Sequence, residues 1–351
     1  MAAKTYYNIK NLLSTNAQYL MLLGMRSNGK SYQVKKTLLE NAYNDKGKFV
    51  YLRRWKADLK QKFVTSYFED MPIGKITNNE FSEVRAINGY IYFVKLKKGV
   101  IDSKLEIGRY CALNEAERYK SQTFPGYTSI VYEEFITDSM YLDEEPRTLQ
   151  QFVSTVFRLN RGSVFLVGNT ISRVCPYFSE WCLDGVLRQK QGTIEIYHYH
   201  TEEDNIVDIA IEYCENTKNE NVMFFGQSAK QIISGEWDVK EVPKLPRKQY
   251  EYECVYEVLI KYQAFNFILQ LLVEPKDGGV ICFVYPHTKN RKVYRVISDE
   301  FSDLPNVSNR LSNNVKPEQL IMNCIKLDKI CYSDNLTGSD FKKVIEHLKI
   351  K

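Results

Sequence analysis

The sequence predicts an α/β fold with a mostly parallel sheet, followed by a smaller α+β domain. Up to about residue 200, short apolar runs alternate with helical or irregular segments, which is typical of an open sheet with helices on its faces. A Pro/Lys/Arg-rich stretch, PKLPRK at 243–248, then precedes neighbouring β-rich runs and a closing helical segment. We therefore expect three parts: a first domain at 1–200, a bridging linker at 201–248 and a second domain at 249–351.

The first predicted strand, Tyr19–Leu23, runs into the turn GMRSNGKS at residues 24–31. This turn fits every position of the pattern G-x-x-x-x-G-K-[S/T], and a helical pattern follows it. Such loops surround the phosphates of a nucleoside triphosphate with backbone N–H groups. The sequence therefore predicts a nucleotide site at this loop.

Each part of the loop has an expected role. Gly24 and Gly29 permit the backbone torsions that turn N–H groups inward. Lys30 is expected to reach the β- and γ-phosphates, and the Ser31 hydroxyl is expected to bind Mg²⁺. The predicted nucleotide contacts are Gly24, Met25, Arg26, Ser27, Asn28, Gly29, Lys30, Ser31 and Tyr32.

Further strands are predicted at Lys48–Leu52, in a hairpin that includes Tyr90–Lys95, at Ser129–Tyr132 and at Ser163–Val167. Polar residues begin where several of these strands end. Ligands of open α/β sheets lie at the carboxyl ends of the strands. The residues that follow the strands are therefore the candidate site residues.

Glu133 and Glu134 follow the strand Ser129–Tyr132. Glu133 is expected to join the Mg²⁺ shell and Glu134 to polarise the attacking water, because adjacent residues at a strand end point in different directions. Aspartate is usual at the first position, so the longer arm of Glu133 must fold to reach the same place. The alternative is a pair of solvated glutamates.

Asn169 follows the strand Ser163–Val167 and could hydrogen-bond the γ-phosphate or the attacking water. The alternative is an asparagine that only closes a turn. Arg158 and Arg161 end a helical segment, where a helix dipole also favours cations. We favour Arg158, with Arg161 second, as an arginine finger that a neighbouring subunit supplies. Lys120 is a further candidate acting across subunits.

Net charge, the length of apolar runs and the spacing of cysteines limit which classes of protein fit this sequence. The formal charge of +5 on 41.1 kDa is mild, so any nucleic-acid footprint must be local. No apolar run approaches the roughly 18 residues of a membrane span, and the first residues lack the apolar core of a signal peptide. We expect no membrane partner and a cytoplasmic location. The eight cysteines form no C-x-x-C pair and are expected to be reduced thiols.

Several blocks along residues 18–180 occur in an order that resembles the DNA-encapsidation ATPases of small tailed bacteriophages, the phi-29-like packaging motors. These blocks are GMRSNGKSY at 24–32, FVYLRRWK at 49–56, SIVYEEF at 129–135, STVFRLNR at 154–161, the strand before Asn169, and CPYF at 175–178.

The resemblance implies a P-loop ATPase of the additional-strand, conserved-glutamate (ASCE) type that uses ATP and Mg²⁺. It implies a homopentameric ring on the portal vertex of an empty capsid, which drives double-stranded DNA inward in the host cytoplasm. Portal protein and possible structural packaging RNA are the implied partners. Lys30 and Ser31 become the phosphate and metal contacts, Glu134 the catalytic glutamate and Arg158 the finger.

The resemblance also implies that the second domain is a ribonuclease H-type nuclease fold without its metal-binding carboxylates. A basic cluster in it would then contact DNA phosphates, through Lys289, Arg291, Lys292 and Arg295. The alternative is a basic hairpin edge that deters aggregation. For the whole chain, the other hypotheses are a P-loop small-molecule or nucleoside kinase and a nucleotide-switch binding module. Glu134 favours hydrolysis over the phosphate transfer of a kinase.

Overall fold

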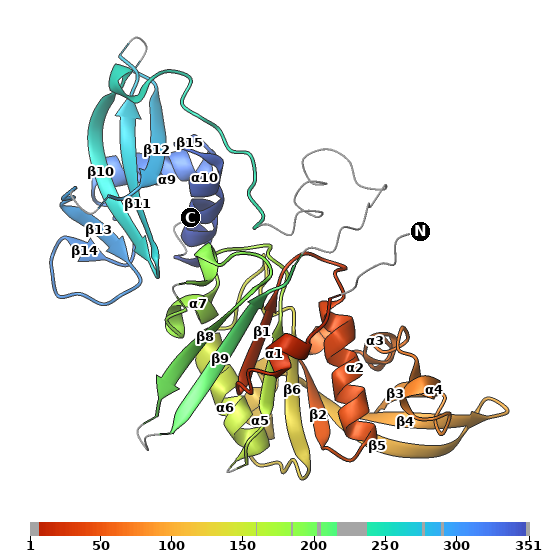
Figure 1. Cartoon of the computed structure of the whole chain (residues 1–351). Helices are drawn as coiled ribbons and strands as arrows, with labels where there is room; N and C mark the ends of the chain where they lie inside the picture. Colours follow the sequence, from red (N-terminus) through yellow and green to blue (C-terminus); the bar gives the residue numbers. More distant parts are fainter. Residues whose placement is uncertain are drawn as a thin grey trace. The chain divides into compact units, whose positions relative to one another are not determined.

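The computed structural model describes residues 7–158, 160–183, 185–201, 205–215, 237–275, 278–288 and 291–348. The chain forms two compact units (Figure 1). The first consists of Met1–Ile171 with Glu180–Trp237, and the second of Ser172–Ser179 with Asp238–Lys351. Within the described ranges, no helix has both the length and the apolar character needed to cross a membrane.

The first unit is built on a nine-stranded sheet with the order β3-β4-β5-β2-β6-β7-β1-β9-β8. From β5 to β9 the neighbouring strands all run parallel, and antiparallel strands flank them on both sides. The β4–β5 hairpin extends beyond the other strands of this sheet (Figure 1). The strands are β1 (Tyr19–Leu23), β2 (Lys48–Arg53), β3 (Glu83–Ile87), β4 (Tyr90–Lys97), β5 (Val100–Ala112), β6 (Tyr127–Glu133), β7 (Ser163–Val167), β8 (Thr193–His200) and β9 (Ile206–Tyr213).

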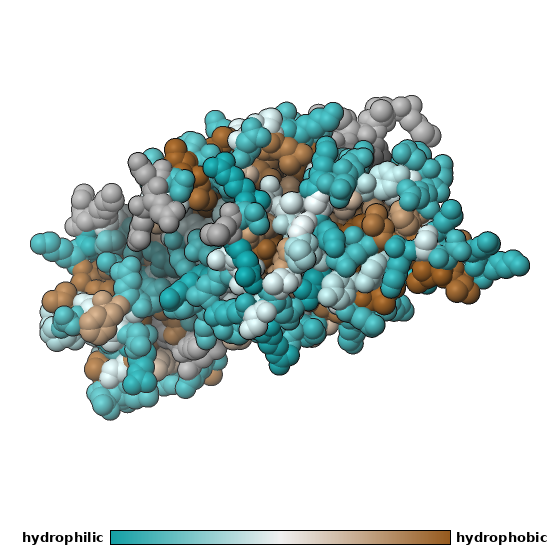
Figure 2. Space-filling model, turned by 90° about the horizontal axis from the view of Figure 1, so that it is seen from below, coloured by the Kyte–Doolittle hydropathy of each residue, from teal (hydrophilic) through white to brown (hydrophobic). Residues whose placement is uncertain are grey.

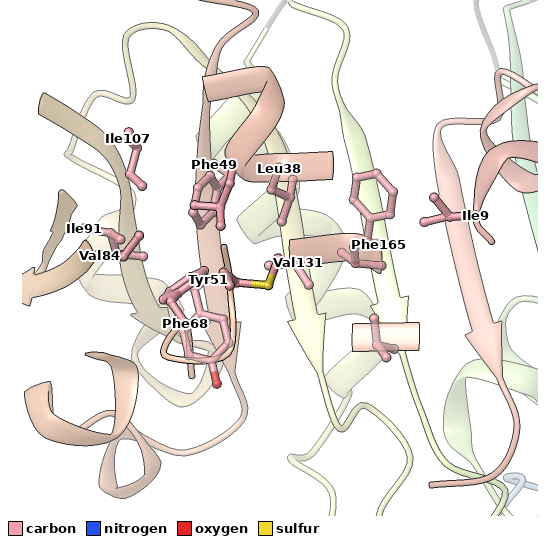
Figure 3. Packing of buried hydrophobic residues seen from close by; sticks show 14 of the residues in the cluster. Ile9, Leu38, Phe49, Tyr51, Phe68, Val84, Ile91, Ile107, Val131 and Phe165 are labelled. Carbon is pink, nitrogen blue, oxygen red and sulfur yellow. The ribbon is translucent and has the colours of Figure 1, made fainter. Parts of the chain in front are cut away.

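Both faces of this sheet carry helices, as the sequence predicts for an α/β fold. Buried side chains of β2, β6 and β7 form one core with Leu38 of α2, as Figure 3 shows for Phe49, Val131 and Phe165. Because side chains alternate along a strand, Tyr132 points to the opposite face, where α6 packs against β6. The helices are α1 (Lys10–Leu13), α2 (Lys30–Tyr43), α3 (Gln61–Ser66), α4 (Ile73–Ile76), α5 (Ala116–Tyr119) and α6 (Glu145–Phe157).

The strand order decides which residues can meet. Strand β7 lies between β1 and β6, and β2 lies on the far side of β6. Since these strands are parallel, their carboxyl ends share one edge of the sheet. The loop after β1 therefore lies at the same edge as Glu133, Asn169 and Arg53, which end or follow the other three strands.

The sheet also includes chain that the sequence prediction assigned to the bridging segment. Strand β9 pairs with β1 along Tyr19–Leu23 and with β8 on its other side. The predicted boundary at residue 200 thus falls inside the sheet, between β8 and β9. Ile209, Ala210 and Ile211 of β9 are buried beside β1, so this part of the strand forms core rather than linker.

The second unit has a six-stranded mixed sheet with the order β14-β13-β10-β11-β12-β15. Strands β10, β11 and β12 are antiparallel, whereas β13, β14 and β15 join by parallel pairing. Helices α9 and α10 supply Ile321 and Phe341 to its core. The elements are α7 (Pro176–Glu180), β10 (Glu253–Tyr262), β11 (Phe265–Val273), β12 (Val280–Pro286), β13 (Arg295–Ser298), β14 (Val307–Ser308), α9 (Lys316–Lys326), β15 (Ile330–Tyr332) and α10 (Asn335–His347).

Hydrophilic side chains dominate the face seen in Figure 2, and hydrophobic patches interrupt them. Six of the eight cysteines are buried. Cys175 belongs to the short segment 172–179, which is part of the second unit and inserts Val174 into its core. Arg173 of the same segment forms an ion pair with Asp340 of α10, with 2.9 Å between Nη1 and Oδ2.

Candidate functional site

The glycine-rich turn forms a tight loop between β1 and α2. Gly24 has φ +146° and Gly29 has φ +99°, values that residues with side chains rarely adopt. Gly29 caps the amino end of α2, whose first turn contains Lys30 and Ser31. The first N–H groups of a helix have no partner within it and carry partial positive charge. The loop therefore presents an anion site at the carboxyl edge of the sheet.

Lys30 is buried beneath this loop. Its Nζ donates to the carbonyl oxygens of Met25 (2.6 Å) and Gly24 (3.2 Å), and to the side-chain oxygen of Asn28 (3.3 Å). Burial lowers the pKa of Lys30 to about 8. The loop thus holds the ammonium group in place by uncharged oxygens, which an anionic ligand can replace.

Glu133 ends β6 and lies opposite the first turn of α2. The Ser31 hydroxyl donates to its Oε2 at 3.2 Å, and the Tyr67 hydroxyl donates to its Oε1 at 2.5 Å. Burial raises the pKa of Glu133, and these two hydrogen bonds oppose that shift. The hydroxyl and the carboxylate are hard oxygen ligands of the kind that Mg²⁺ binds together with substrate phosphates.

Glu134 lies one residue further on, in a turn with φ +57°. Its N–H donates to the carbonyl of Val167 at 2.9 Å, so the backbone of β7 fixes the turn. The side chain is 61% exposed and forms an ion pair with Arg53, with 2.8 Å between Oε2 and Nη2. Glu133 and Glu134 therefore point in different directions, one buried and one toward solvent.

A cavity of about 280 Å³ opens at the loop. Asn169 lines it and accepts a hydrogen bond from Lys30 Nζ at 3.3 Å through its side-chain oxygen. Lys35 and Asp70 also line the cavity and pair with each other at 2.5 Å. The other lining residues are Arg26, Ser27, Asn28, Gly29, Lys30, Ser31 and Tyr32. The predicted nucleotide contacts from Arg26 to Tyr32 thus share one cavity with Asn169.

The sequence profile of the podovirus DNA encapsidation protein (Gp16) family matches residues 1–212. The chain belongs to this family. Its matched part contains the loop, both glutamates and all strands of the parallel sheet except the last residue of β9. The second unit, apart from its segment 172–179, lies outside the match.

Two relatives from Bacillus phages, both described as DNA packaging proteins, are 31% identical to this Gp16-family chain over the residues that align. The protein of phage phi29 aligns over 183 residues, 51% of this chain and 50% of the relative. The protein of phage B103 aligns over 171 residues, 48% of this chain and 49% of the relative. The chain spans about half the length of the curated relatives that it matches.

Two solved structures are similar over nearly the whole chain. The bacteriophage Phi-29 viral genome packaging motor assembly superposes with a TM-score of 0.57 at 18% identity, covering 98% of this chain and 99% of that one. The Phi-28 gp11 DNA packaging motor gives a TM-score of 0.53 at 18% identity, covering 99% of each chain. At this identity the likeness concerns the fold, and it extends to both units of the Gp16-family chain.

The candidate trans-acting cations lie away from the loop of their own chain. Arg158 and Arg161 precede the amino end of β7, whereas the loop lies at the carboxyl edge. The Arg158 side chain is exposed and donates to the Gln122 carbonyl at 3.2 Å. Lys120 follows α5 and pairs with Glu117 at 2.6 Å. Within one subunit these three residues do not meet Lys30.

The predicted basic cluster of the second unit is only partly available for phosphates. Arg295 has a side chain that is 14% exposed, and it donates to the buried carboxylate of Glu318 at 2.7 Å. This burial argues against the predicted DNA contact for Arg295. Arg291 pairs with Glu257 at 2.5 Å and is partly exposed, and Lys292 is exposed. Lys289 lies outside the described residues.

Two important contacts were missed by the sequence reasoning. Arg54, the residue after β2, is buried, with its Nε 2.7 Å from Glu145 Oε2. Its guanidinium also donates to the carbonyls of Glu134 (3.2 Å) and Phe135 (2.7 Å), which fixes the turn that carries Glu134. Tyr67, whose hydroxyl donates to Glu133, belongs to none of the sequence motifs considered above. The sequence signal that could indicate a packed segment there is the group of aromatic residues Phe63, Tyr67 and Phe68.

Proposed function

We propose that this chain is the ATPase subunit of a motor that moves double-stranded DNA into a preformed viral capsid. The observation that carries the proposal is the meeting of Lys30, Ser31, Glu133, Glu134 and Asn169 at one sheet edge in a Gp16-family chain. The phi29 relative is described as a DNA packaging protein, and the similar solved structures are packaging motors.

In this proposal the phosphates of ATP occupy the cavity at the loop. Lys30 exchanges its carbonyl partners for β- and γ-phosphate oxygens, which is favourable because the charged head is already desolvated and aimed at the loop. Ser31 and Glu133 are suited to hold Mg²⁺, since both are oxygen ligands and already lie 3.2 Å apart. The metal would neutralise charge on the phosphate oxygens.

Glu134 is the proposed base that polarises the attacking water. Glu134 is the residue after Glu133, and its carboxylate is exposed and paired with Arg53. When a water molecule binds, Arg53 must release this carboxylate or share it with the water. Asn169, which contacts Lys30, is placed to hydrogen-bond the γ-phosphate or that water. A carboxylate aimed at water favours hydrolysis over transfer to a small-molecule acceptor, as a kinase would require.

The finer parts of the proposal concern fold type and assembly. The placement of β7 between the loop strand and the glutamate strand supports the ASCE type. We further propose a homo-oligomeric ring, a pentamer, at the portal vertex of the procapsid in the host cytoplasm. Its partners in this proposal are portal protein and DNA, with a structural RNA as a further candidate. The second unit is proposed to be a ribonuclease H-like fold that contacts DNA phosphates through Arg291 and Lys292, without cutting.

The test is ATP turnover by the full chain, with and without double-stranded DNA and procapsids. We expect turnover that DNA or procapsids stimulate, because the motor couples hydrolysis to translocation. Turnover that neither DNA nor procapsids changes, with transfer of phosphate to a nucleoside, would instead support the kinase.

A second arm of this experiment tests the arginine finger. Arg158→Ala subunits mixed into wild-type rings are expected to lower turnover more than in proportion to their fraction, since each removes a charge from a neighbour's site. Arg147→Ala, which changes an exposed arginine within α6, is the matched control. A strictly proportional loss with Arg158→Ala would remove the trans assignment and leave Arg161 as the next candidate.

A further inference from the structure

The buried carboxylate of Glu133 has a donor on each oxygen. Ser31 donates to Oε2, and the Tyr67 hydroxyl donates to Oε1 at 2.5 Å across 66 positions of sequence. Tyr67 follows α3, in the segment between β2 and β3. This segment is therefore joined to the proposed metal site by one hydroxyl group.

The ring of Tyr67 is held on several sides. It packs on Tyr51 of β2 with ring centroids 4.5 Å apart and meets the edge of Phe68 at 4.9 Å. Lys35 of α2 donates to the Tyr67 carbonyl at 2.7 Å and pairs with Asp70 at 2.5 Å. The hydroxyl thus has little freedom to leave Glu133.

A glutamate at this position needs such a partner. Its side chain has one more rotatable bond than aspartate, so fixing its carboxylate costs more conformational entropy. The Tyr67 hydroxyl offsets part of that cost and satisfies an oxygen that would otherwise be buried without a donor. Ser31 donates only to Oε2. Among the hydrogen bonds of the described residues, the donor to Oε1 is the Tyr67 hydroxyl.

The geometry points to Tyr67 as a positioning residue that orients Glu133 for Mg²⁺. This inference rests on the proposed function, since it presumes that Ser31 and Glu133 bind the metal of a nucleotide complex. Residues that orient a metal ligand by hydrogen bonding alter metal affinity by about 10- to 100-fold when they are removed. Tyr67 is assigned this role, and it does not touch the phosphates.

The test compares Tyr67→Phe with wild type. Phenylalanine keeps the ring packing and removes only the hydroxyl. We expect the apparent Mg²⁺ dissociation constant, measured by titrating Mg²⁺ into the full chain with a fluorescent ATP analogue, to rise about tenfold. Direct Mn²⁺ binding followed by electron paramagnetic resonance should weaken similarly. Nucleotide affinity at saturating Mg²⁺ should change little.

The matched control is Tyr43→Phe, which also removes a hydroxyl that donates to a glutamate, at 3.0 Å to Glu80, away from the cavity. It should leave both titrations unchanged. A Tyr67→Phe protein that titrates like wild type would overturn the positioning role, and so would equal shifts in both variants. If wild type shows no Mg²⁺-dependent nucleotide binding at all, the proposed function fails instead.

A double-mutant cycle with Glu133→Asp separates positioning from general stability. The shorter side chain should not reach Tyr67, so Tyr67→Phe is expected to change the Mg²⁺ constant little when it is combined with Glu133→Asp. Independent, multiplicative effects of the two substitutions would contradict a direct link between the hydroxyl and the glutamate arm. Urea unfolding of all variants shows whether each one folds.

Discussion

Glu134→Gln protein is expected to bind ATP with Mg²⁺ almost as wild type does and to hydrolyse it about 10²- to 10⁴-fold more slowly. Glutamine keeps the length of the side chain and can still accept a hydrogen bond from Arg53, so the turn after β6 should persist. It cannot take up a proton from water. The measurement is single-turnover hydrolysis alongside nucleotide affinity.

Asp58→Asn is the control for this variant, because Asp58 is the other carboxylate near Arg53, at 3.5 Å. Removing that partly exposed charge should have little effect on the rate. Hydrolysis by Glu134→Gln at the wild-type rate would refute the catalytic role of Glu134. A loss of ATP binding in the same variant would indicate instead that the residue belongs to the binding site.

Arg54→Met is expected to lower the free energy of unfolding of the first unit by about 3–5 kcal/mol. The substitution leaves the carboxylate of Glu145, which is fully buried, without its cation. The Tyr132 hydroxyl still donates to Glu145 at 2.7 Å, but it brings no compensating charge. Because Arg54 also holds the carbonyl of Glu134, turnover should fall as well. Urea unfolding followed by tryptophan fluorescence gives the loss.

Two comparisons sharpen this prediction. Lys36→Met breaks an exposed ion pair with Glu40 and should change stability by less than about 0.5 kcal/mol. Arg54→Met combined with Glu145→Gln should recover part of the loss, since the buried negative charge that Arg54 neutralises is then removed as well. A loss in Arg54→Met as small as that in Lys36→Met would show that the buried pair does not stabilise the fold.

Local patterns predicted much of the first unit. The loop at 24–31 needs glycines at two left-handed positions and a lysine and serine at the start of a helix, so sequence spacing alone specifies it. The strands that end at Arg53, Glu133 and Val167 are short apolar runs followed by polar residues. Their shared edge follows from parallel pairing, which the alternation of strands and helices indicates.

Contacts between distant segments could not be predicted in this way. Tyr67 meets Glu133 only because the segment after β2 folds back against α2, where Lys35 donates to the Tyr67 carbonyl, and no spacing in the sequence encodes that path. The burial of Arg54 and of Arg295 depends on acidic partners 91 and 23 positions away. A cation that a pattern assigns to a ligand can therefore belong to the core instead.

The boundary of the first unit shows the same limit. Residues 201–205 carry charges that suggest a linker, yet β9 follows them directly and pairs with the loop strand β1. The composition of a short stretch describes only that stretch. Whether the stretch joins a sheet depends on pairing with a strand that lies far away in the sequence. The nearly complete superposition with two motor structures reveals a two-unit fold that the weaker patterns after residue 200 did not specify.

The central claim is that the loop at Gly24–Ser31 binds ATP with Mg²⁺ through Lys30 and the Ser31–Glu133 pair. Isothermal titration calorimetry of the full chain with Mg·ATP tests it most directly. The account predicts saturable binding by wild type that weakens about 100-fold or more in Lys30→Ala, because several charge-assisted contacts to phosphate are lost together. Equal affinities of wild type and Lys30→Ala, or no binding by a folded wild-type chain, would contradict it.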